Sequence, residues 1–187
     1  MQEINRKDFL QKTGSALVVS VIASSNLSCS DEANKMDRKI RFANLEEALV
    51  ELKKIETAKQ ITPNGDWSWY QILNHCAQSI EYSLTGYPEN KPAIFRATVG
   101  KIASSVFSLR GYMSHDLNAP IPNAPAIPKS GDEKEAMLRL YKAIEDFKNF
   151  SGQLKIHFAY GELSKQEYDQ AHAMHIANHL SFVEVVL

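Results

Sequence analysis

Cysteine is scarce in this chain, and neither sign of charge dominates it. There are 2 cysteines among 187 residues, and 21 basic side chains are balanced by 22 acidic ones. So few cysteines cannot build a disulfide framework. A balanced charge gives no basic stripe for nucleic acid and no polybasic membrane patch, so we expect no nucleic-acid partner. Internal repeats and sustained polar–apolar alternation are also missing, which argues against solenoids and β-proteins.

Long hydrophobic runs are missing too. The apolar run Ser15–Ser25 is too short to anchor the chain across a bilayer, and it follows the charged stretch Asn5–Gly14. This order is typical of an export signal. Arg6 and the lysine after it resemble a twin-arginine signal with lysine in the second position. The alternative is a disordered or helical extension of a cytoplasmic protein.

The position of Cys29 favours the export interpretation, because it resembles the cleavage site of a bacterial lipoprotein. We expect residues 1–34 to be an export signal and linker, with a lipid anchor on Cys29 left open. The mature protein would then lie in the periplasm or cell envelope. A disulfide from Cys29 to Cys76 would tie the core to a removed segment, so we predict none. Cys76 lies in an apolar helical pattern, which favours a buried hydrophobic residue over a nucleophile.

Residues 35–187 predict one all-α domain with four amphipathic helices. Apolar residues recur at helical spacing over Asn44–Ile61, Ser68–Gly86, Asp132–Phe150 and from Ser164 to the chain end. Ser68 with Gln71, and Ser164 with Glu167, have the spacing of a capping box. Four such helices favour a four-helix bundle.

The connection between the second and third helices is long. We expect an extra helix over Lys91–Tyr112 and a proline-rich loop over Asn118–Gly131, where proline excludes helix. A crossover of this length lets the third helix run parallel to the second.

Three histidines occupy the buried side of the last helix. At about 100° per residue, His172 and His179 fall within about 60° of His175, among apolar residues. Burying several imidazoles is costly unless their nitrogens find partners, and a divalent metal ion supplies one. His175 and His179 have the i,i+4 spacing at which two histidines share an ion.

His75 is the candidate third ligand. It lies roughly 10 Å from the start of its helix, and His179 lies roughly 12 Å from the chain end. His75 and His179 then lie at the same level along the bundle if the second and fourth helices run antiparallel. Imidazole ligands suit Zn²⁺, Ni²⁺ or Fe²⁺, and three of them leave coordination positions open, as in a catalytic site.

The remaining histidines carry weaker signals. His172 is a candidate fourth ligand, outer-sphere partner or acid–base group. His115 and His157 lie in predicted loops, where we expect surface positions. A di-iron bundle needs two Glu-x-x-His motifs and is set aside, because only Asp169-x-x-His172 approaches one. The plain alternative is that all these histidines only pack.

The segment DWSWYQILNHCAQSIEYSLTG, which contains His75, resembles the second helix of the DinB/YfiT-like metalloenzymes. The segment His157–Val183 resembles the end of one branch, catalogued as domain of unknown function 1569. The likeness extends from about Asn44 to the C-terminus. It implies a bundle in up-down-down-up order that binds one divalent ion through three histidines, matched here by His75, His175 and His179.

Two functions remain open at this point. The first is an exported metal-dependent hydrolase or transferase of unknown small-molecule substrate. Some relatives transfer low-molecular-weight thiols, but those cofactors are cytosolic, so export favours hydrolysis. The second is a non-catalytic metal- or small-ligand-binding module of the envelope. Because relatives of this kind often pair, a homodimer is also left open.

Overall fold

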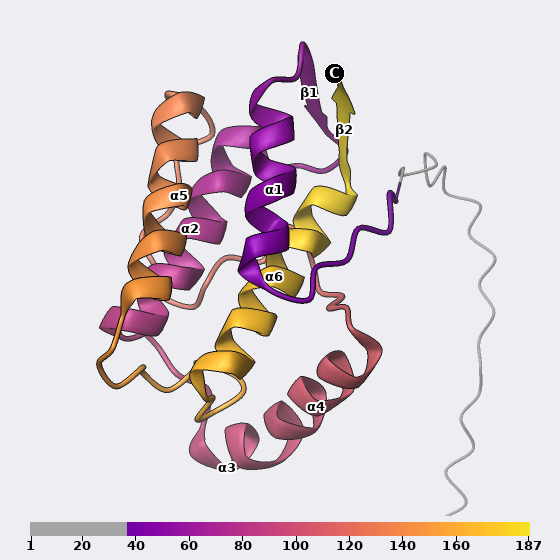
Figure 1. Cartoon of the computed structure of the whole chain (residues 1–187). Coiled ribbons are helices and arrows are strands. Elements are labelled where there is room, and N and C mark those ends of the chain that lie inside the picture. Colours follow the sequence, from indigo (N-terminus) through magenta and orange to yellow (C-terminus); the bar gives the residue numbers. More distant parts are fainter. Residues whose placement is uncertain (1–36) are drawn as a thin grey trace, which may run out of the picture. The chain divides into compact units, whose positions relative to one another are not determined.

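A computed structural model describes residues 37–187, which are mostly helical (Figure 1). The predicted export signal and the Cys29 anchor lie outside the described residues. The elements are α1 (Leu45–Glu56), β1 (Gln60–Pro63), α2 (Trp69–Thr85), α3 (Ala93–Phe95), the π-helical turn η1 (Arg96–Gly100), α4 (Lys101–Arg110), α5 (Glu133–Asn149), α6 (Lys165–Ser181) and β2 (Val183–Val186). No helix in this part of the chain combines the length and hydrophobicity needed to cross a membrane.

The predicted helix starts are confirmed by their caps. The Ser68 side chain accepts from the Gln71 amide, and the Gln71 side chain accepts from the Ser68 amide, which completes the capping box of α2. Ser164 and Glu167 make the same pair of bonds at α6. These bonds satisfy N–H groups that have no partner inside the helix, so each helix begins where its local sequence predicts.

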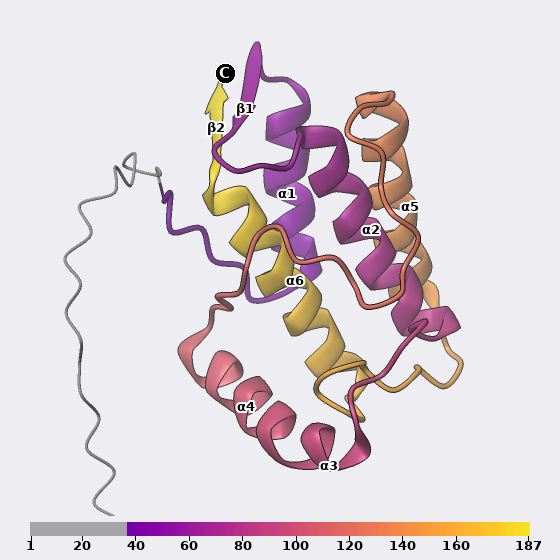
Figure 2. The ribbon, with the colours of Figure 1, turned by 180° about the vertical axis from the view of Figure 1, so that it is seen from behind.

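The four long helices form two layers that enclose one core. Helix α2 packs on α5, and α1 packs on α6. In Figures 1 and 2, α1 and α6 run toward the end that carries the two strands, whereas α2 and α5 run away from it. Helices α2 and α6 are therefore antiparallel neighbours. This is the arrangement that brings His75 and His179 to the same level.

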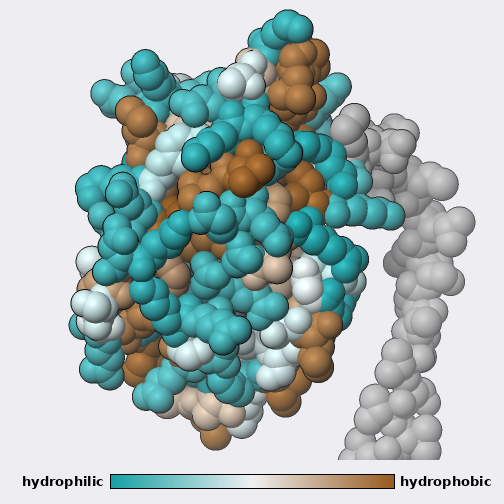
Figure 3. All heavy atoms as spheres, in the orientation of Figure 1, coloured by the Kyte–Doolittle hydropathy of each residue, from teal (hydrophilic) through white to brown (hydrophobic). Residues whose placement is uncertain are grey.

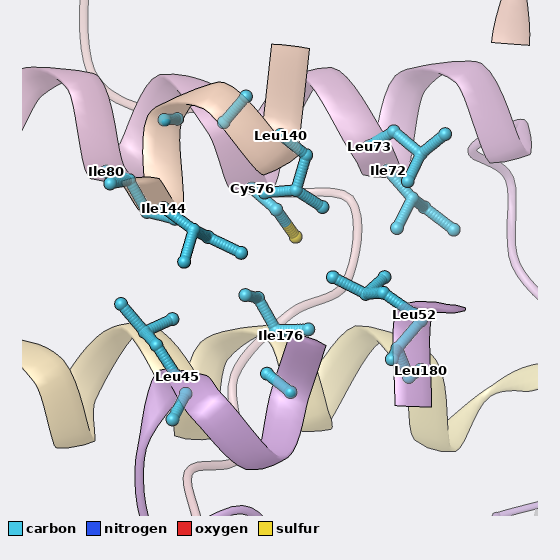
Figure 4. Close-up of a cluster of buried hydrophobic side chains, with 14 of the residues drawn as sticks. Leu45, Leu52, Ile72, Leu73, Cys76, Ile80, Leu140, Ile144, Ile176 and Leu180 are labelled. Carbon is cyan, nitrogen blue, oxygen red and sulfur yellow. The ribbon is translucent and has the colours of Figure 1, made fainter. Parts of the chain in front are cut away.

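Aliphatic side chains from both layers meet between them. Figure 4 shows Cys76 and Leu140 of one layer facing Ile176 of the other. The Cys76 side chain is 2% exposed, and burial raises the pKa of its thiol to about 12. A thiol that stays protonated is a poor nucleophile, so the structure favours the hydrophobic role of Cys76.

A polar clamp outside this core fixes α2 against α5. The Arg139 guanidinium donates to both carboxylate oxygens of Glu81, over 2.8 and 2.7 Å, and to Oδ1 of Asn74 over 2.7 Å. A bidentate guanidinium–carboxylate pair is directional as well as attractive. The clamp therefore orients the turn of α2 that carries His75.

The two strands correct the purely helical expectation. The first predicted helix ends at Glu56 rather than Ile61, and the last ends at Ser181 rather than at the chain end. The released residues pair antiparallel, with Pro63 opposite Val183. Each strand has four residues, which is too short for alternation to show in the sequence, and their pairing is non-local.

The extra helix is confirmed as one helical run, α3–η1–α4. Its inner face contacts α6: the Ser108 hydroxyl donates to Oε1 of Gln170 over 2.8 Å, and Lys101 lies 3.7 Å from Glu167. Gly100 packs so closely that a Cβ there would lie 1.8 Å from the Ala159 carbonyl oxygen. The outer face exposes a set of apolar side chains, Ile94, Val99, Ile102, Val106 and Leu109. Figure 3 shows hydrophobic surface along the lower edge of the molecule, where this helical run lies.

Candidate metal centre

Three histidines from two helices converge in the interior. His75 lies on α2, and His175 and His179 lie one turn apart on α6. His75 and His179 are 3% and 2% exposed, and His175 is 9% exposed. One helix therefore contributes two adjacent ring nitrogens, and its antiparallel neighbour contributes the third.

The small sheet sets the height at which these rings meet. The sequence predicted a helix that continues to the chain end, with His179 well inside it. Because α6 ends at Ser181, His179 lies in the last turn instead. The pairing of β1 with β2 continues into a bond from the Asn64 amide to the Phe182 carbonyl, of 2.8 Å. This bond holds the end of α6 beside the segment that leads into α2. His179 and His75 therefore lie at the same level because the sheet positions the end of α6, and not because the ends of the two helices are aligned.

The Nε2 atom of His175 is the centre of the group. It lies 3.1 Å from Nε2 of His75 and 3.2 Å from Nε2 of His179. The ligand atoms of all three residues lie within 4.8 Å of one another. The same distances suit N–H···N hydrogen bonds between neutral rings. With a lone pair on each Nε2, the three rings can instead bind one cation.

The two separations from the His175 Nε2 fit a shared metal ion. With metal–nitrogen bonds of about 2.1 Å, two imidazole nitrogens lie about 3.0 Å apart at an octahedral angle and about 3.4 Å apart at a tetrahedral one. The two measured separations, 3.1 and 3.2 Å, fall within that range. Neutral imidazoles of this kind suit Zn²⁺ and its first-row neighbours.

Burial keeps the three rings neutral. It lowers the pKa of His75 to about 3, with a smaller contribution from His115. Burial also lowers the pKa of His175 and His179 well below the usual histidine value, and the neighbouring imidazoles lower it further. At neutral pH each ring therefore keeps a nitrogen lone pair free for a cation.

The comparison with protein families adds one finding. A model described as "Protein of unknown function (DUF1569)" matches residues 34–185. The chain belongs to this family. No curated protein and no solved structure matches it. Family membership confirms domain of unknown function 1569, which the segment His157–Val183 indicated, and leaves the function to be argued from the site.

One side of the DUF1569 centre is covered by Trp67, which precedes α2. Its ring lies 4.8 Å from the His75 ring, edge-on, and 6.0 Å from the His179 ring, nearly parallel. A large ring at these positions shields the two imidazoles from solvent. This contact was not foreseen, because Trp67 lies before the capping box and outside the helical pattern.

A cavity of about 180 Å³ lies against His75. Its far wall is the proline-rich segment, which two side chains of α2 hold in place. Gln71 donates to the Ile127 carbonyl over 3.3 Å, and Gln78 donates to the Pro125 carbonyl over 3.3 Å. These glutamines lie about one turn on either side of His75, so the segment spans the histidine.

His172 lies beside a different set of rings. It stacks on Tyr168 at 5.2 Å and meets Phe147 edge-on at 5.3 Å. Its Nε2 is buried and has no hydrogen-bond partner among the described residues. This position is typical of a packed ring, and the acid–base or ligand role of His172 stays a prediction.

His157 is buried, so the expected surface position was wrong. It is 7% exposed, and its Nδ1 accepts from the Ala159 and Tyr160 amides, each over 3.1 Å. Its ring stacks on that of Tyr160 at 4.2 Å. His157 thus shapes the turn before α6, a role that only the fold reveals.

His115 is the site residue that sequence reasoning missed. It follows α4 in the loop toward the proline-rich segment, yet its ring lies 5.0 Å from that of His175 and 5.4 Å from that of His179. Burial lowers its pKa. No periodic pattern surrounds His115, so its approach to the centre left no signal in the sequence.

Proposed function

We propose that this chain is a DinB/YfiT-like bundle protein that binds one divalent metal ion through His75, His175 and His179. The observation that carries the proposal is the position of the His175 Nε2, 3.1 and 3.2 Å from the other two Nε2 atoms. The histidine segments and the antiparallel course of α2 and α6 support it. The resemblance to this superfamily also implies the up-down-down-up order of the four helices.

We further propose that the centre serves metal-assisted hydrolysis. A bound divalent ion supplies Lewis-acid polarisation and lowers the pKa of a water ligand. The imidazoles remain neutral and hold the ion, while Trp67 and the packed helices exclude bulk water. Exclusion of water strengthens electrostatic interactions at the reacting atoms.

The cavity beside His75 is the proposed substrate site. Nδ1 of His75 and Oδ1 of Asn118 are buried without hydrogen-bond partners in the described part of the chain, and both residues line the cavity. With its Nε2 directed to the ion, His75 carries the ring proton on Nδ1. A small polar substrate, such as an ester or amide, that reached these two atoms would find one donor and one acceptor.

Metal analysis of the purified protein tests the centre. Wild-type protein reconstituted with Zn²⁺ or Ni²⁺ should hold close to one equivalent, and His175→Ala should hold far less. If the wild type binds less than about a tenth of an equivalent, the histidines are not a metal site and serve only in packing.

Hydrolysis is tested separately. Metal-loaded protein is screened against esters, amides and thiol conjugates, with His175→Ala as the matched inactive variant. An activity that both proteins share comes from a contaminant. A metal-loaded protein with no activity on any class would favour the envelope-binding module, for which the small cavity is also suited.

Export is proposed from the charged and apolar order of the first residues. Fractionation of cells that express the full chain tests it, because a processed species should leave the cytoplasm. A full-length species confined to the cytoplasm would overturn export and restore thiol transfer as a candidate reaction.

A further inference from the structure

The loop after α4 delivers a fourth imidazole to the candidate centre. The rings of His75, His175 and His179 have centroids 4.8 to 5.1 Å apart. His115 extends this cluster, with its centroid 5.0 Å from that of His175 and 5.4 Å from that of His179. His115 therefore lies beside the two imidazoles of α6, at ring separations close to those among the three proposed ligands.

The spacing of the rings is that of imidazoles around one ion. A ring bound at about 2.1 Å through a nitrogen has its centroid about 3.2 Å from the metal. Two such rings then have centroids about 4.5 Å apart at an octahedral angle and about 5.2 Å apart at a tetrahedral one. Both His115 separations lie near the tetrahedral value.

The backbone carbonyl of Asp116 determines which ring nitrogen of His115 carries the proton. Nδ1 of His115 lies 2.8 Å from the Asp116 carbonyl oxygen, which can only accept, so Nδ1 carries the proton and donates. The Nε2 atom is left with a free lone pair. A donor bond from one ring nitrogen to a backbone carbonyl is the usual outer-sphere contact of a metal-bound histidine.

The loop is fastened on both sides of His115. Met113 is 8% exposed. On the other side, the Asn118 side chain donates to Oδ2 of Asp66 over 2.9 Å, and its amide donates to Oδ1 of Asp116 over 2.9 Å. The bond to Asp66 ties the loop to the segment that leads into α2. The ring of His115 is therefore held beside the cluster by bonds independent of any ion.

We propose that His115 is a fourth, loop-borne ligand of the ion, resting on the metal centre proposed above. The three helical histidines hold the ion, and His115 occupies a coordination position that the helices leave open. Because its loop is the least regular element of the centre, this is the position that an incoming ligand would take by displacing His115.

Cobalt substitution tests the proposal, because the visible spectrum of Co²⁺ reports the number and type of its ligands. The full chain is stripped with a chelator, loaded with Co²⁺ and compared with His115→Phe, which keeps a ring but removes the nitrogens. Ser114→Ala, an exposed neighbour in the same loop, is the matched control. His175→Ala tests the helical site itself.

The wild type and His115→Phe should each bind one equivalent, with affinity in the variant lower by at least about 10-fold, because loss of an outer-sphere partner alone costs about that much. The spectrum of His115→Phe should differ from that of the wild type. Added azide should change the variant's spectrum at concentrations that leave the wild type unaltered. Ser114→Ala should match the wild type throughout.

Equal affinities and identical spectra for wild type and His115→Phe would overturn the fourth ligand and leave the three-histidine centre intact. A wild-type chain that binds no cobalt or zinc would overturn both. The two failures are therefore distinguished by the wild type alone.

Discussion

The sharpest test of the candidate centre is the effect of zinc on stability when His175 is replaced by alanine. His175 is chosen because its Nε2 lies next to both of the other ligand atoms, 3.1 and 3.2 Å away. A ligand that binds only the folded state, at 100 times its dissociation constant, stabilises that state by about 2.7 kcal/mol. For a domain of this size, that gain raises the melting temperature by about 5–11 °C.

His175→Ala should lose most of this effect. If loss of the central ligand weakens zinc binding about 100-fold, the same zinc concentration stabilises the variant by only about 0.4 kcal/mol, or about 1–2 °C. Each protein is melted with and without zinc by circular dichroism. Since each variant is compared with its own metal-free state, the packing lost with the imidazole cancels.

The matched control is His172→Leu, one turn earlier on α6 and also buried. It should keep the full zinc shift, because His172 contacts Tyr168 and Phe147 rather than the cluster. The reasoning is refuted if zinc shifts His175→Ala as much as the wild type, or if His172→Leu loses the shift instead.

Three further outcomes follow from burial and close contact. Burial lowers the pKa of three histidines to about 3 in the metal-free folded protein: His75, His157 and His172. As the pH falls below about 6.5, these histidines take up protons in the unfolded chain before they do so in the folded one. The free energy of unfolding is therefore full above about pH 6.5 and falls toward pH 3 by up to about 1.4 kcal/mol per pH unit for each such histidine. Urea unfolding at pH 7 and pH 5 measures this, and equal stabilities would contradict it. His172→Leu removes a buried ring nitrogen that has no hydrogen-bond partner among the described residues. The free energy of unfolding of the metal-free variant should therefore stay nearly the same or rise. A large loss in urea unfolding would contradict this, because it would mean that the nitrogen makes a stabilising hydrogen bond. Gly100→Ala should cost about 1–3 kcal/mol, because a Cβ would lie 1.8 Å from the Ala159 carbonyl oxygen. Exposed Ser105→Ala should stay within about 0.5 kcal/mol in the same denaturation assay, and matching curves would refute the contact.

Local chemistry determined the helices. The capping boxes at Ser68 and Ser164 depend on residues three apart, and the glycine after α2 ends that helix as expected. Each signal acts within one turn of backbone, so it is visible in the sequence without the fold. The periodic placement of His175 and His179 on one helix face belongs to the same class. The sequence therefore predicted the long helices and which side of α6 carries the imidazoles.

Tertiary structure decided how these elements meet. The sheet between Gln60–Pro63 and Val183–Val186 joins segments far apart in the chain, and it sets the height at which His179 reaches His75. No local pattern encodes such a pairing, because its hydrogen bonds join residues near opposite ends of the domain sequence. His115 shows the same limit. A lone histidine in an irregular loop looks like a surface residue until the bond between Asn118 and Asp66 holds its loop against the entry to α2, because loop position depends on contacts with distant residues and not on periodicity.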